Sequence, residues 1–394
     1  MKVLLINSVC GTGSTGKICV DLYNGLTNLG HNCCIAYGRG DNKSNINTYK
    51  IGNKLETLLH VLESRLFDNH GFASRKATED FILFIEEYDP DIINLHNVHG
   101  YYLNIEILFE YLKKKNIPLV WTFHDAWPFS GHVAYIDYLE DKELPKKNIN
   151  FKERFSYPKS FIDKSAINWE KKKRIFSNLN NCTIVTPSNW LNKMTKNSFF
   201  KCYDIITINN GIDLSRYKEK TEDYSINEKS KKNILAVANV WEKRKGLDDV
   251  IYFCNNLDNN YNFTIVGGVK KKLPSSVTHI NRTDNVDVLI DLYKKADVFI
   301  NPTYQDNFPT TNIESLAAGT PVITYDTGGS GEIIDKNTGF IVKQGSRSDF
   351  IEKIVSIKKD KNVSEYCKSR ALKYNKDVMV NSYIKLYQKN LDKK

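Results

Sequence analysis

Short runs of apolar residues, rich in valine and isoleucine, recur along the whole chain and alternate with segments of helical periodicity. The runs lie at residues 2–7, 91–96, 118–124, 183–188 and 204–209 in the first half, and at 233–239, 263–268, 297–302, 321–326 and 339–343 in the second. Such continuously apolar runs are typical of strands in parallel sheets that helices cover on both faces. The sequence therefore predicts an α/β protein with doubly wound parallel sheets.

A polar stretch, RYKEKTEDYSINEKSKK at residues 216–232, separates the two sets of predicted strands. A chain of 394 residues is also too long for one core of ordinary size. We therefore predict a first domain over residues 1–212, a linker over 213–232 and a second domain over 233–372, with ligands bound at the carboxyl ends of the strands. The last segment, residues 373–394, has a helical period and is predicted to pack back on the first domain.

Charge and cysteine usage narrow the class of protein. The formal net charge is +10, and basic runs such as EKKKR at 170–174 fit either an anionic partner or a solvated surface. Eight cysteines are scattered without a C-x-x-C pair, and a strand is predicted directly after Met1. These features predict reduced, mostly buried thiols in a cytoplasmic protein. No apolar run is long enough to span a bilayer, so any membrane contact is expected to be peripheral.

The stretch VCGTGSTGKIC, residues 9–19, directly follows the first predicted strand. Its glycines at positions 11, 13 and 16 match the G-x-G-x-x-G of a dinucleotide fold, and the same stretch nearly matches a P-loop. The P-loop interpretation fails because Ile18 stands where a serine or threonine would bind magnesium. The dinucleotide interpretation stays open, since Arg39 in the strand predicted at 33–41 could accept a 2′-phosphate.

The segment NPTYQDNFPTTNIESLAAGTPVITYDTGG, residues 301–329, carries the strongest functional signal. A strand is predicted to end at Pro302, Asp306 lies on the following loop, and a helix is predicted to start near Thr310. Free amides and the dipole at such a helix start make a site for a diphosphate. Glu314, in the first or second turn, can accept hydrogen bonds from ribose hydroxyls, and Asp306 can reach a sugar beyond the phosphates. Taken alone, Glu314 fits equally well as an acidic residue that favours its own helix N-terminus.

Two further segments carry residue types that suit the same chemistry. AVANVWEKRKGLDDVI, residues 236–251, places Lys245 between a strand and a helix, where a cation can stabilise a departing diphosphate. WTFHDAWPFSGH, residues 121–132, places His124 and Asp125 at the end of another strand. Both segments therefore point to the edge of a parallel sheet where ligands bind.

Three more histidines are candidates for the acceptor side of the predicted cleft: His96, His99 and His132. As metal ligands, His96 and His99 lack a third partner at a diagnostic spacing, so no metal site is predicted. Each of the three could instead stabilise a turn. The DPD sequence at 89–91 is interpreted as a turn that leads into the next strand.

Asp306 and Glu314, with seven residues between them and SLAAGTPVI after them, resemble the E-x7-E region of glycosyltransferase family 4. The KRKG sequence and the T-x-H-D histidine resemble two other motifs of this family of retaining GT-B enzymes. HDAWPFSGH looks like a subgroup common in bacterial surface-polysaccharide assembly. The chain departs from the pattern in two places. Asp306 replaces the usual glutamate, and Asn239 stands where many members carry an arginine, whose charge Arg244 or Lys243 is expected to supply.

The resemblance implies a GT-B fold, in which two Rossmann-like domains face each other across a cleft. It implies transfer of a sugar from a nucleotide-diphosphate donor, with UDP-sugars favoured, to a hydroxyl of a glycan or a polyprenyl-diphosphate-linked oligosaccharide, with retention and without a cofactor or metal. Catalytic roles are implied for His124, Lys245, Asp306 and Glu314. Donor contacts are implied for Gly13, Gly16, Arg244, Lys245, Asp306, Phe308, Pro309, Thr310, Thr311 and Glu314. Acceptor contacts are implied for Asp125, His96, His99 and His132.

One segment raises the question of a membrane partner. INWEKKKRIFSNL, residues 167–179, sets apolar residues among four consecutive basic ones, which fits a helix on an anionic membrane surface or a surface helix with one buried face. The family resemblance adds the expectation of a lipid-linked acceptor in capsule, O-antigen or exopolysaccharide assembly at the inner face of the cell membrane. Two other functions stay open: a sugar-nucleotide epimerase or phosphorylase, and an NADP-dependent oxidoreductase. A nucleic-acid partner is not expected, because no recognition module accompanies the charge.

Overall fold

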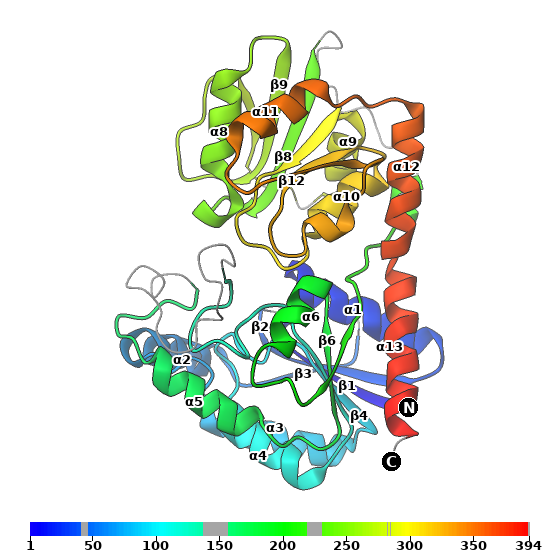
Figure 1. The fold of residues 1–394 in the computed structure, drawn as a ribbon. Coiled ribbons are helices and arrows are strands. Elements are labelled where there is room, and N and C mark those ends of the chain that lie inside the picture. Colours follow the sequence, from blue (N-terminus) through cyan, green and yellow to red (C-terminus); the bar gives the residue numbers. More distant parts are fainter. Residues whose placement is uncertain (41–45, 137–156, 219–230, 282, 284, 393–394) are drawn as a thin grey trace. The chain divides into compact units, whose positions relative to one another are not determined.

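The computed structural model describes residues 1–40, 46–136, 157–218, 231–281, 283 and 285–392. The chain divides into two compact units, which we call unit 1 (Met1–Asn209 and Met379–Lys394) and unit 2 (Asn210–Val378). Each unit contains one parallel sheet with helices packed against it (Figure 1). The predicted α/β class with doubly wound parallel sheets is confirmed.

The sheet of unit 1 has the strand order β3-β2-β1-β4-β5-β6-β7, and every described pairing is parallel. The strands are β1 (Lys2–Val9), β2 (Asn32–Arg39), β3 (Thr48–Lys50), β4 (Ile92–Leu95), β5 (Leu119–Thr122), β6 (Cys182–Thr186) and β7 (Asp204–Thr207). Leu4 and Ile6 of β1 belong to one buried apolar cluster, and the alternate residues Val3 and Leu5 belong to another. Both faces of the sheet are therefore covered, which explains why this strand is continuously apolar.

Helices surround this sheet, and the last helix of the chain is one of them (Figure 1, red). They are α1 (Gly13–Asn28), α2 (Lys54–Phe67), α3 (Arg75–Tyr88), α4 (Ile105–Lys115), α5 (Ser165–Phe176), α6 (Asn189–Lys196) and α13 (Lys376–Leu391). Tyr383 of α13 lies 3.0 Å from the hydroxyl of Thr122, and Tyr387 donates a 2.6 Å hydrogen bond to Asn94. The described part of α13 from Met379 on thus packs on the sheet of unit 1.

Unit 2 repeats the architecture with the strand order β10-β9-β8-β11-β12-β13. Its strands are β8 (Lys232–Val240), β9 (Tyr261–Gly268), β10 (Val277–Ile280), β11 (Val298–Asn301), β12 (Val322–Tyr325) and β13 (Gly339–Val342). Its helices are α7 (Ser215–Lys218), α8 (Leu247–Asn256), α9 (Val286–Lys295), α10 (Thr310–Ala317), α11 (Arg347–Ser356) and α12 (Lys361–Ala371). Because all strands of a parallel sheet end at the same edge, the loops after β8 and β11 meet there.

Two predicted features lie partly outside the described residues. These are the end of the strand predicted at 33–41 and residues 219–230 of the predicted linker. At the start of that linker, Leu214 is buried in the core of unit 2. None of the eight cysteines, all of which lie in the described residues, forms a disulfide, and Cys202 alone among them is exposed. No helix in the described ranges has the length and apolar character needed to cross a membrane.

Candidate active site

The strongest constellation of predicted residues lies at the carboxyl edge of the unit 2 sheet. Asp306, on the loop between β11 and α10, forms an ion pair with Lys245 and accepts a 3.3 Å hydrogen bond from the amide of Phe308. Gly246 allows this approach, because its φ is +75° and a Cβ there would lie 1.9 Å from the carbonyl oxygen of Pro302. The fold thus joins two predicted site residues that are 61 positions apart in the sequence.

Arg244 lies on the same pair of loops. Its Nη1 donates to the carbonyl oxygen of Gln305 over 3.3 Å, and its Nε donates to Glu242 over 3.1 Å. Asn239, the position at which family members commonly carry an arginine, is exposed at the end of β8, and Lys243 is also exposed. Of the two cations considered as replacements, Arg244 is therefore the one whose side chain bonds to the loop after β11.

The N-terminus of α10 completes this edge. The helix begins at Thr310 after Pro309, and no side chain caps it. The helix itself offers no acceptor for the amides of Thr310 and Thr311, so these donors and the helix dipole favour an anion there. Phe308, also predicted to contact the donor, is buried, and its ring centroid lies 5.7 Å from that of Tyr374. Its side chain is thus part of the core of unit 2.

Glu314 lies on the second turn of α10 and is half-buried. Its Oε2 accepts a 3.1 Å hydrogen bond from the hydroxyl of Tyr293. Burial, reinforced by the charge of Glu314, raises the pKa of Tyr293 well above its usual value, so this tyrosine remains a neutral donor. The tyrosine thereby holds the carboxylate in place.

A buried carboxylate that the sequence analysis missed supports the loop after β11. Asp249 of α8 accepts hydrogen bonds of 2.7 Å from the hydroxyls of both Tyr304 and Tyr325, and it lies 2.6 Å from Nη2 of Arg347. It thereby ties the loop to the start of α11. The available signal was an acidic residue on the apolar face of a helix, beside Val250.

The glycine-rich loop after β1 lies at the corresponding edge of unit 1. Gly13 has a φ of +63°, begins α1 and would meet no atom within 4 Å if it carried a Cβ. Gly16 is different, because its Cβ would lie 3.1 Å from the amide nitrogen of Gly11 and 3.2 Å from Val9. The missing side chain at Gly16 therefore lets α1 pack on the loop. The donor contacts of Gly13 and Gly16 stay a prediction.

His96 and His124 form a pair at the ends of β4 and β5. His96 Nδ1 lies 3.0 Å from His124 Nε2, and the rings are stacked with centroids 5.3 Å apart. Burial lowers the pKa of His124 to about 4, and burial together with His124 lowers the pKa of His96 well below its usual value. Both rings are therefore neutral at pH 7 and act as hydrogen-bonding groups.

Asp125 and His99 form the next pair along this edge. His99 Nε2 lies 2.9 Å from Asp125 Oδ2, and the amide of Trp127 donates a 3.0 Å hydrogen bond to Asp125 Oδ1. Burial alone would raise the pKa of Asp125, but the charge and hydrogen bond of His99, with the Trp127 amide, lower it. Asp125 is therefore an ionised carboxylate with both oxygens occupied.

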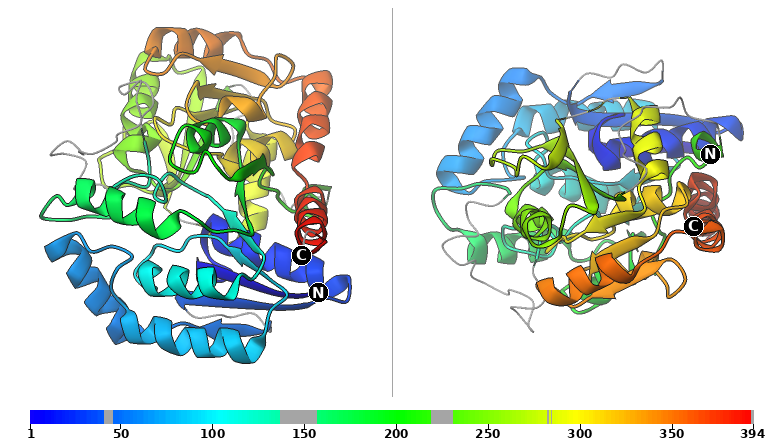
Figure 2. Two further views of the ribbon diagram at one scale, coloured as in Figure 1. Left: turned by 60° about the horizontal axis from the view of Figure 1, so that its bottom comes forward. Right: turned by 90° about the horizontal axis from the view of Figure 1, so that it is seen from above.

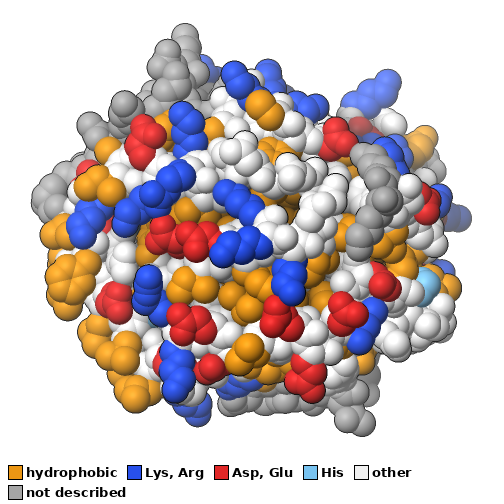
Figure 3. Space-filling model, turned by 90° about the horizontal axis from the view of Figure 1, so that it is seen from below, with side chains coloured by type: hydrophobic (Ala, Val, Ile, Leu, Met, Phe, Trp, Pro, Cys, Tyr) orange, Lys and Arg blue, Asp and Glu red, His pale blue; other side chains and the backbone are white. Residues whose placement is uncertain are grey.

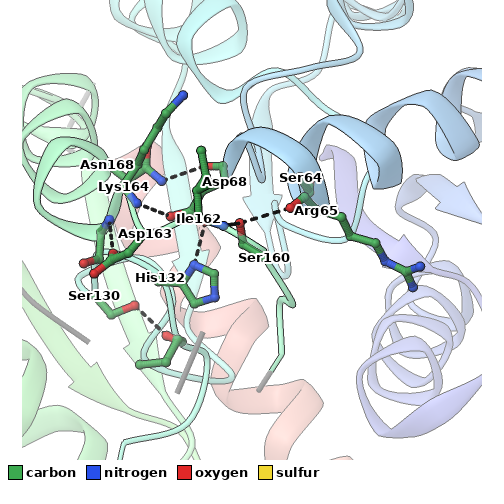
Figure 4. A network of polar contacts seen from close by, with 12 residues as sticks. Ser64, Arg65, Asp68, Ser130, His132, Ser160, Ile162, Asp163, Lys164 and Asn168 are labelled. Atoms are coloured by element: carbon green, nitrogen blue, oxygen red, sulfur yellow. Dashed lines mark hydrogen bonds and ion pairs between the residues drawn. The ribbon is translucent and has the colours of Figure 1, made fainter. Parts of the chain in front are cut away.

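His132 lies apart from these pairs. It is buried, and its Nδ1 lies 2.6 Å from Asp68 Oδ1, as Figure 4 shows. Asp68, at the C-terminal cap of α2, also accepts a 2.8 Å hydrogen bond from the amide of Lys164. The contact between His132 and Asp68 thus joins the loop after β5 to the end of α2, which matches the alternative that this residue stabilises a turn.

The predicted membrane helix, described as α5, turns much of its apolar side inward. Ile175 and Phe176 are buried in the core of unit 1. Lys172, one of the four consecutive basic residues, is also buried, and its Nζ donates to the carbonyl oxygens of Trp127 and Ser130 over 2.9 and 3.1 Å. These residues cannot reach an outer surface, which favours the interpretation of α5 as a surface helix with one buried face.

Arg39 ends β2 at the carboxyl edge of unit 1. Its guanidinium carbon lies 5.7 Å from the ring centroid of Tyr101, and its Nε is buried without a hydrogen-bond partner. In the described parts of the chain, it forms no ion pair with an acidic residue. This is the arginine to which the dinucleotide interpretation assigned a 2′-phosphate. Among the described residues, no group of three or more histidine, cysteine and acidic side chains could hold a metal ion.

Two family models match consecutive parts of the chain. The model described as "Glycosyltransferase Family 4" matches residues 15–216, more than half of the chain. The model described as "Glycosyl transferases group 1" matches residues 218–374. Both matches name glycosyl transfer, and neither supports the epimerase, phosphorylase or oxidoreductase interpretations.

Curated relatives agree with the family matches. The Escherichia coli (strain K12) protein WcaC, assigned as a colanic acid biosynthesis glycosyl transferase, is 21% identical over 417 residues, which cover 98% of this chain and 100% of the relative. The N,N′-diacetylbacillosaminyl-diphospho-undecaprenol alpha-1,3-N-acetylgalactosaminyltransferase of Campylobacter jejuni is 26% identical over 204 residues, 45% of this chain and 52% of the relative.

Solved structures show the same fold. Sucrose-phosphate synthase from Thermosynechococcus elongatus has a TM-score of 0.73 at 14% identity, with 100% of both chains covered. The Anabaena protein HepE, solved in complex with UDP, has a TM-score of 0.65 at 14% identity and covers 99% of this chain and 100% of its own. At these identities the likeness shows the fold alone, which is the GT-B fold. Together with the family matches, it establishes that the chain is a glycosyltransferase and belongs to glycosyltransferase family 4.

Proposed function

We propose that this enzyme transfers a sugar from a UDP-sugar, with retention, to a hydroxyl of a glycan or polyprenyl-diphosphate-linked oligosaccharide during bacterial surface-polysaccharide assembly. The observation that carries the proposal is the carboxyl edge of unit 2, where Lys245, Asp306 and the uncapped start of α10 come together. The UDP complex of HepE supports the choice of nucleotide. WcaC and the Campylobacter enzyme, by their names, support the pathway and the lipid-linked acceptor.

Different residues of unit 2 contact the diphosphate, the ribose and the sugar of the donor. Lys245 and Arg244, with the first amides of α10, stabilise the negative charge that develops on the departing diphosphate. Glu314, held by Tyr293, accepts hydrogen bonds from the ribose. Asp306 contacts the transferred sugar. When the donor binds, the Lys245–Asp306 ion pair must therefore either break or remain while the Lys245 ammonium also donates a hydrogen bond to the diphosphate. No metal is needed in this scheme, because protein cations neutralise the diphosphate.

The residues of unit 1 act as neutral or fully occupied groups. His124, neutral because burial lowers its pKa to about 4, exchanges hydrogen bonds with sugar hydroxyls and carries no charge. Asp125 is held by His99 and the Trp127 amide, which argues against its use as a covalent nucleophile. Retention then follows a front-face path, in which the leaving phosphate takes the proton of the acceptor hydroxyl.

The acceptor is assigned to unit 1. His96 and His99 lie at its carboxyl edge, and Arg39 there carries a positive charge without an acidic partner among the described residues. A cation in this position suits an acceptor that bears a phosphate group. A polyprenyl-linked acceptor would also place the enzyme at an anionic membrane surface.

A thermal-shift screen with UDP-, GDP-, dTDP- and ADP-sugars tests the proposal, because a ligand that binds the folded state raises its stability. We expect UDP-sugars to give the largest shift. Product analysis with an acceptor should then show the anomeric configuration of the donor retained. Turnover of the donor without any acceptor, to give an isomer of the sugar nucleotide, would contradict the proposal.

A further inference from the structure

Helix α2 turns polar residues inward and apolar residues outward, which is the reverse of a helix that packs on a hydrophobic core. Its buried residues are His60 and Ser64, which are polar and four positions apart. Its opposite side is formed by five leucines, Leu55, Leu58, Leu59, Leu62 and Leu66, which we call the leucine face and whose exposed fractions lie between 45% and 64%. A helix of a globular protein normally turns such a face inward, so an outward leucine face points to a surface that docks on something else.

Polar contacts fix the inner side of α2 in this orientation. His60 Nδ1 lies 2.8 Å from the hydroxyl of Ser74, and the amide of Gly71 donates a 3.1 Å hydrogen bond to His60 Nε2. The side chain of Asn53 and that of Glu56 form a reciprocal capping box at the N-terminus. Rotation of α2 to bury its leucines would break these bonds, so the outward leucine face is a property of the fold.

The segment before α5 extends this apolar surface. Phe161, Ile162 and Ile167 are exposed. The amide of Phe161 donates a 2.8 Å hydrogen bond to the carbonyl oxygen of Arg65, and the network around Asp68 holds the same segment against the end of α2 (Figure 4). In the left view of Figure 2, α2 (blue) lies at the outer edge of unit 1. The leucine face and these three residues therefore form one surface, which we call the docking face.

Basic side chains flank the docking face. With about 3.6 residues per turn, Lys54 and Arg65 fall on one flank of the leucine face. Neither forms an ion pair with a described residue, and Figure 4 shows the guanidinium of Arg65 extending away from the network. Nζ of Lys164 lies 5.9 Å from the ring centroid of Phe67, which places this charge beside the exposed apolar end of α2. Figure 3 shows hydrophobic side chains on the left side, where Figure 1 places α2, with basic and acidic side chains among them.

The acidic residues of α2 have internal partners. On the opposite flank, Glu56 accepts a hydrogen bond of 3.0 Å from the amide of Asn53, and Glu63 accepts one of 2.8 Å from Asn69. An antiparallel pairing of two copies through the leucine face would set Lys54 of one copy beside Arg65 of the other, and the like charges disfavour this contact. An anionic lipid surface instead matches both the leucines and the basic flank.

We propose that the docking face is the membrane-binding surface of this enzyme, with the leucine face entering the headgroup region of an anionic leaflet and Lys54, Arg65 and Lys164 contacting lipid phosphates. This inference rests on the proposed function for its biological purpose, which is access to a lipid-linked acceptor. It moves the membrane contact from the predicted helix at 167–179 to α2 and the segment that leads into α5.

Flotation with phosphatidylglycerol–phosphatidylcholine vesicles tests the docking face on the full chain, without donor or acceptor. The triple variant Leu58→Ser/Leu62→Ser/Leu66→Ser should weaken binding by about a hundredfold or more, because each buried leucine contributes to partitioning. The matched control Leu29→Ser/Val355→Ser/Leu372→Ser removes equally exposed apolar side chains elsewhere and should bind like the wild type. Arg65→Glu/Lys164→Glu should weaken binding by roughly tenfold or more at low salt, and phosphatidylcholine vesicles alone should bind poorly.

Two results would overturn this assignment. In one, the leucine triple variant floats as well as the wild type. In the other, the wild type does not bind vesicles and instead forms a dimer in solution that the triple variant abolishes. A UDP-induced thermal shift that persists in the triple variant shows that the variant is folded. If the wild type shows a UDP-induced thermal shift but binds no vesicles, the docking face is wrong and the donor site is retained. If the wild type binds vesicles but shows no UDP-induced thermal shift, the proposed function is wrong and the docking face is retained.

Discussion

The carboxyl edges of the two sheets use different chemistry. In unit 2, Lys245, Asp306 and Glu314 are half-buried, so they keep contact with solvent while bonded to neighbours. In unit 1, His96 and His99 are buried, and seven of the eight histidines of the chain belong to this unit. We expect from this difference that unit 2 supplies the charges that a diphosphate requires, whereas the buried, neutral His96 and His124 of unit 1 supply hydrogen bonds beside the ionised Asp125. This division of labour is a prediction of the proposed function.

Removal of a charge in unit 2 should have the largest effect on activity. Lys245→Ala should lower kcat/KM by about a thousandfold, as expected when one preorganised charge at a developing anion is lost. Steady-state kinetics with the donor identified in the nucleotide screen checks this. Lys271→Ala is the matched control, because Lys271 forms an exposed ion pair with Asp248 in the same unit and should leave kcat/KM unchanged.

Acid should destabilise unit 1 first. Burial lowers the pKa of His60 to about 3 and that of His124 to about 4, from an ordinary value near 6.5. The folded state therefore binds fewer protons than the unfolded chain between these values, so the stabilisation is present above pH 6.5 and is lost as the pH falls toward 4. Hydrogen exchange from pH 7 down to 4 should show the amides of β4 and β5 losing protection before those of β11 and β12. The reverse order would contradict the comparison.

The network around Asp249 should contribute stability rather than chemistry. Asp249→Ala leaves Arg347 and two buried tyrosine hydroxyls without their acceptor, which should cost about 3 kcal/mol in the free energy of unfolding. Denaturant unfolding monitored by circular dichroism measures this. Equal stability of the variant and the wild type would show that the buried carboxylate does not support the loop after β11.

The smallest effect is expected for metal removal. Chelation with EDTA should leave kcat/KM within about twofold, because Lys245, Arg244 and the amides at the start of α10 supply the positive charge that a metal otherwise provides. Restoration of a lost activity by Mg²⁺ or Mn²⁺ alone would contradict this division of labour.

Much of the fold could be predicted because buried parallel strands leave a continuous apolar signal. Two strands were not predicted, β3 and β10, each of which lies at one end of its sheet. No residue of either strand is fully buried, so neither leaves such a run. Strands with buried residues can therefore be predicted from the sequence more easily than strands without them.

Part of the site could also be predicted, because some of its residues end or follow predicted strands. Lys245 and Asp306 were found separately, as residues that end or follow strands, and the fold joined them. Asp249 was missed because an acidic residue on an apolar helix face has no partner that the sequence can name. The leucine face was missed because periodicity shows that a helix has an apolar side but not which way that side turns. In α2 the packing of His60 decides the direction.

The most direct test of the account is the dissociation constant for UDP, measured by isothermal titration calorimetry. We expect Lys245→Ala/Glu314→Ala to weaken UDP binding by at least about a hundredfold, since a charge-assisted contact and a ribose contact are both lost. Arg39→Ala in unit 1 should bind UDP like the wild type. UDP affinity that survives the double substitution, or that disappears with Arg39→Ala, would contradict the assignment of the donor to unit 2.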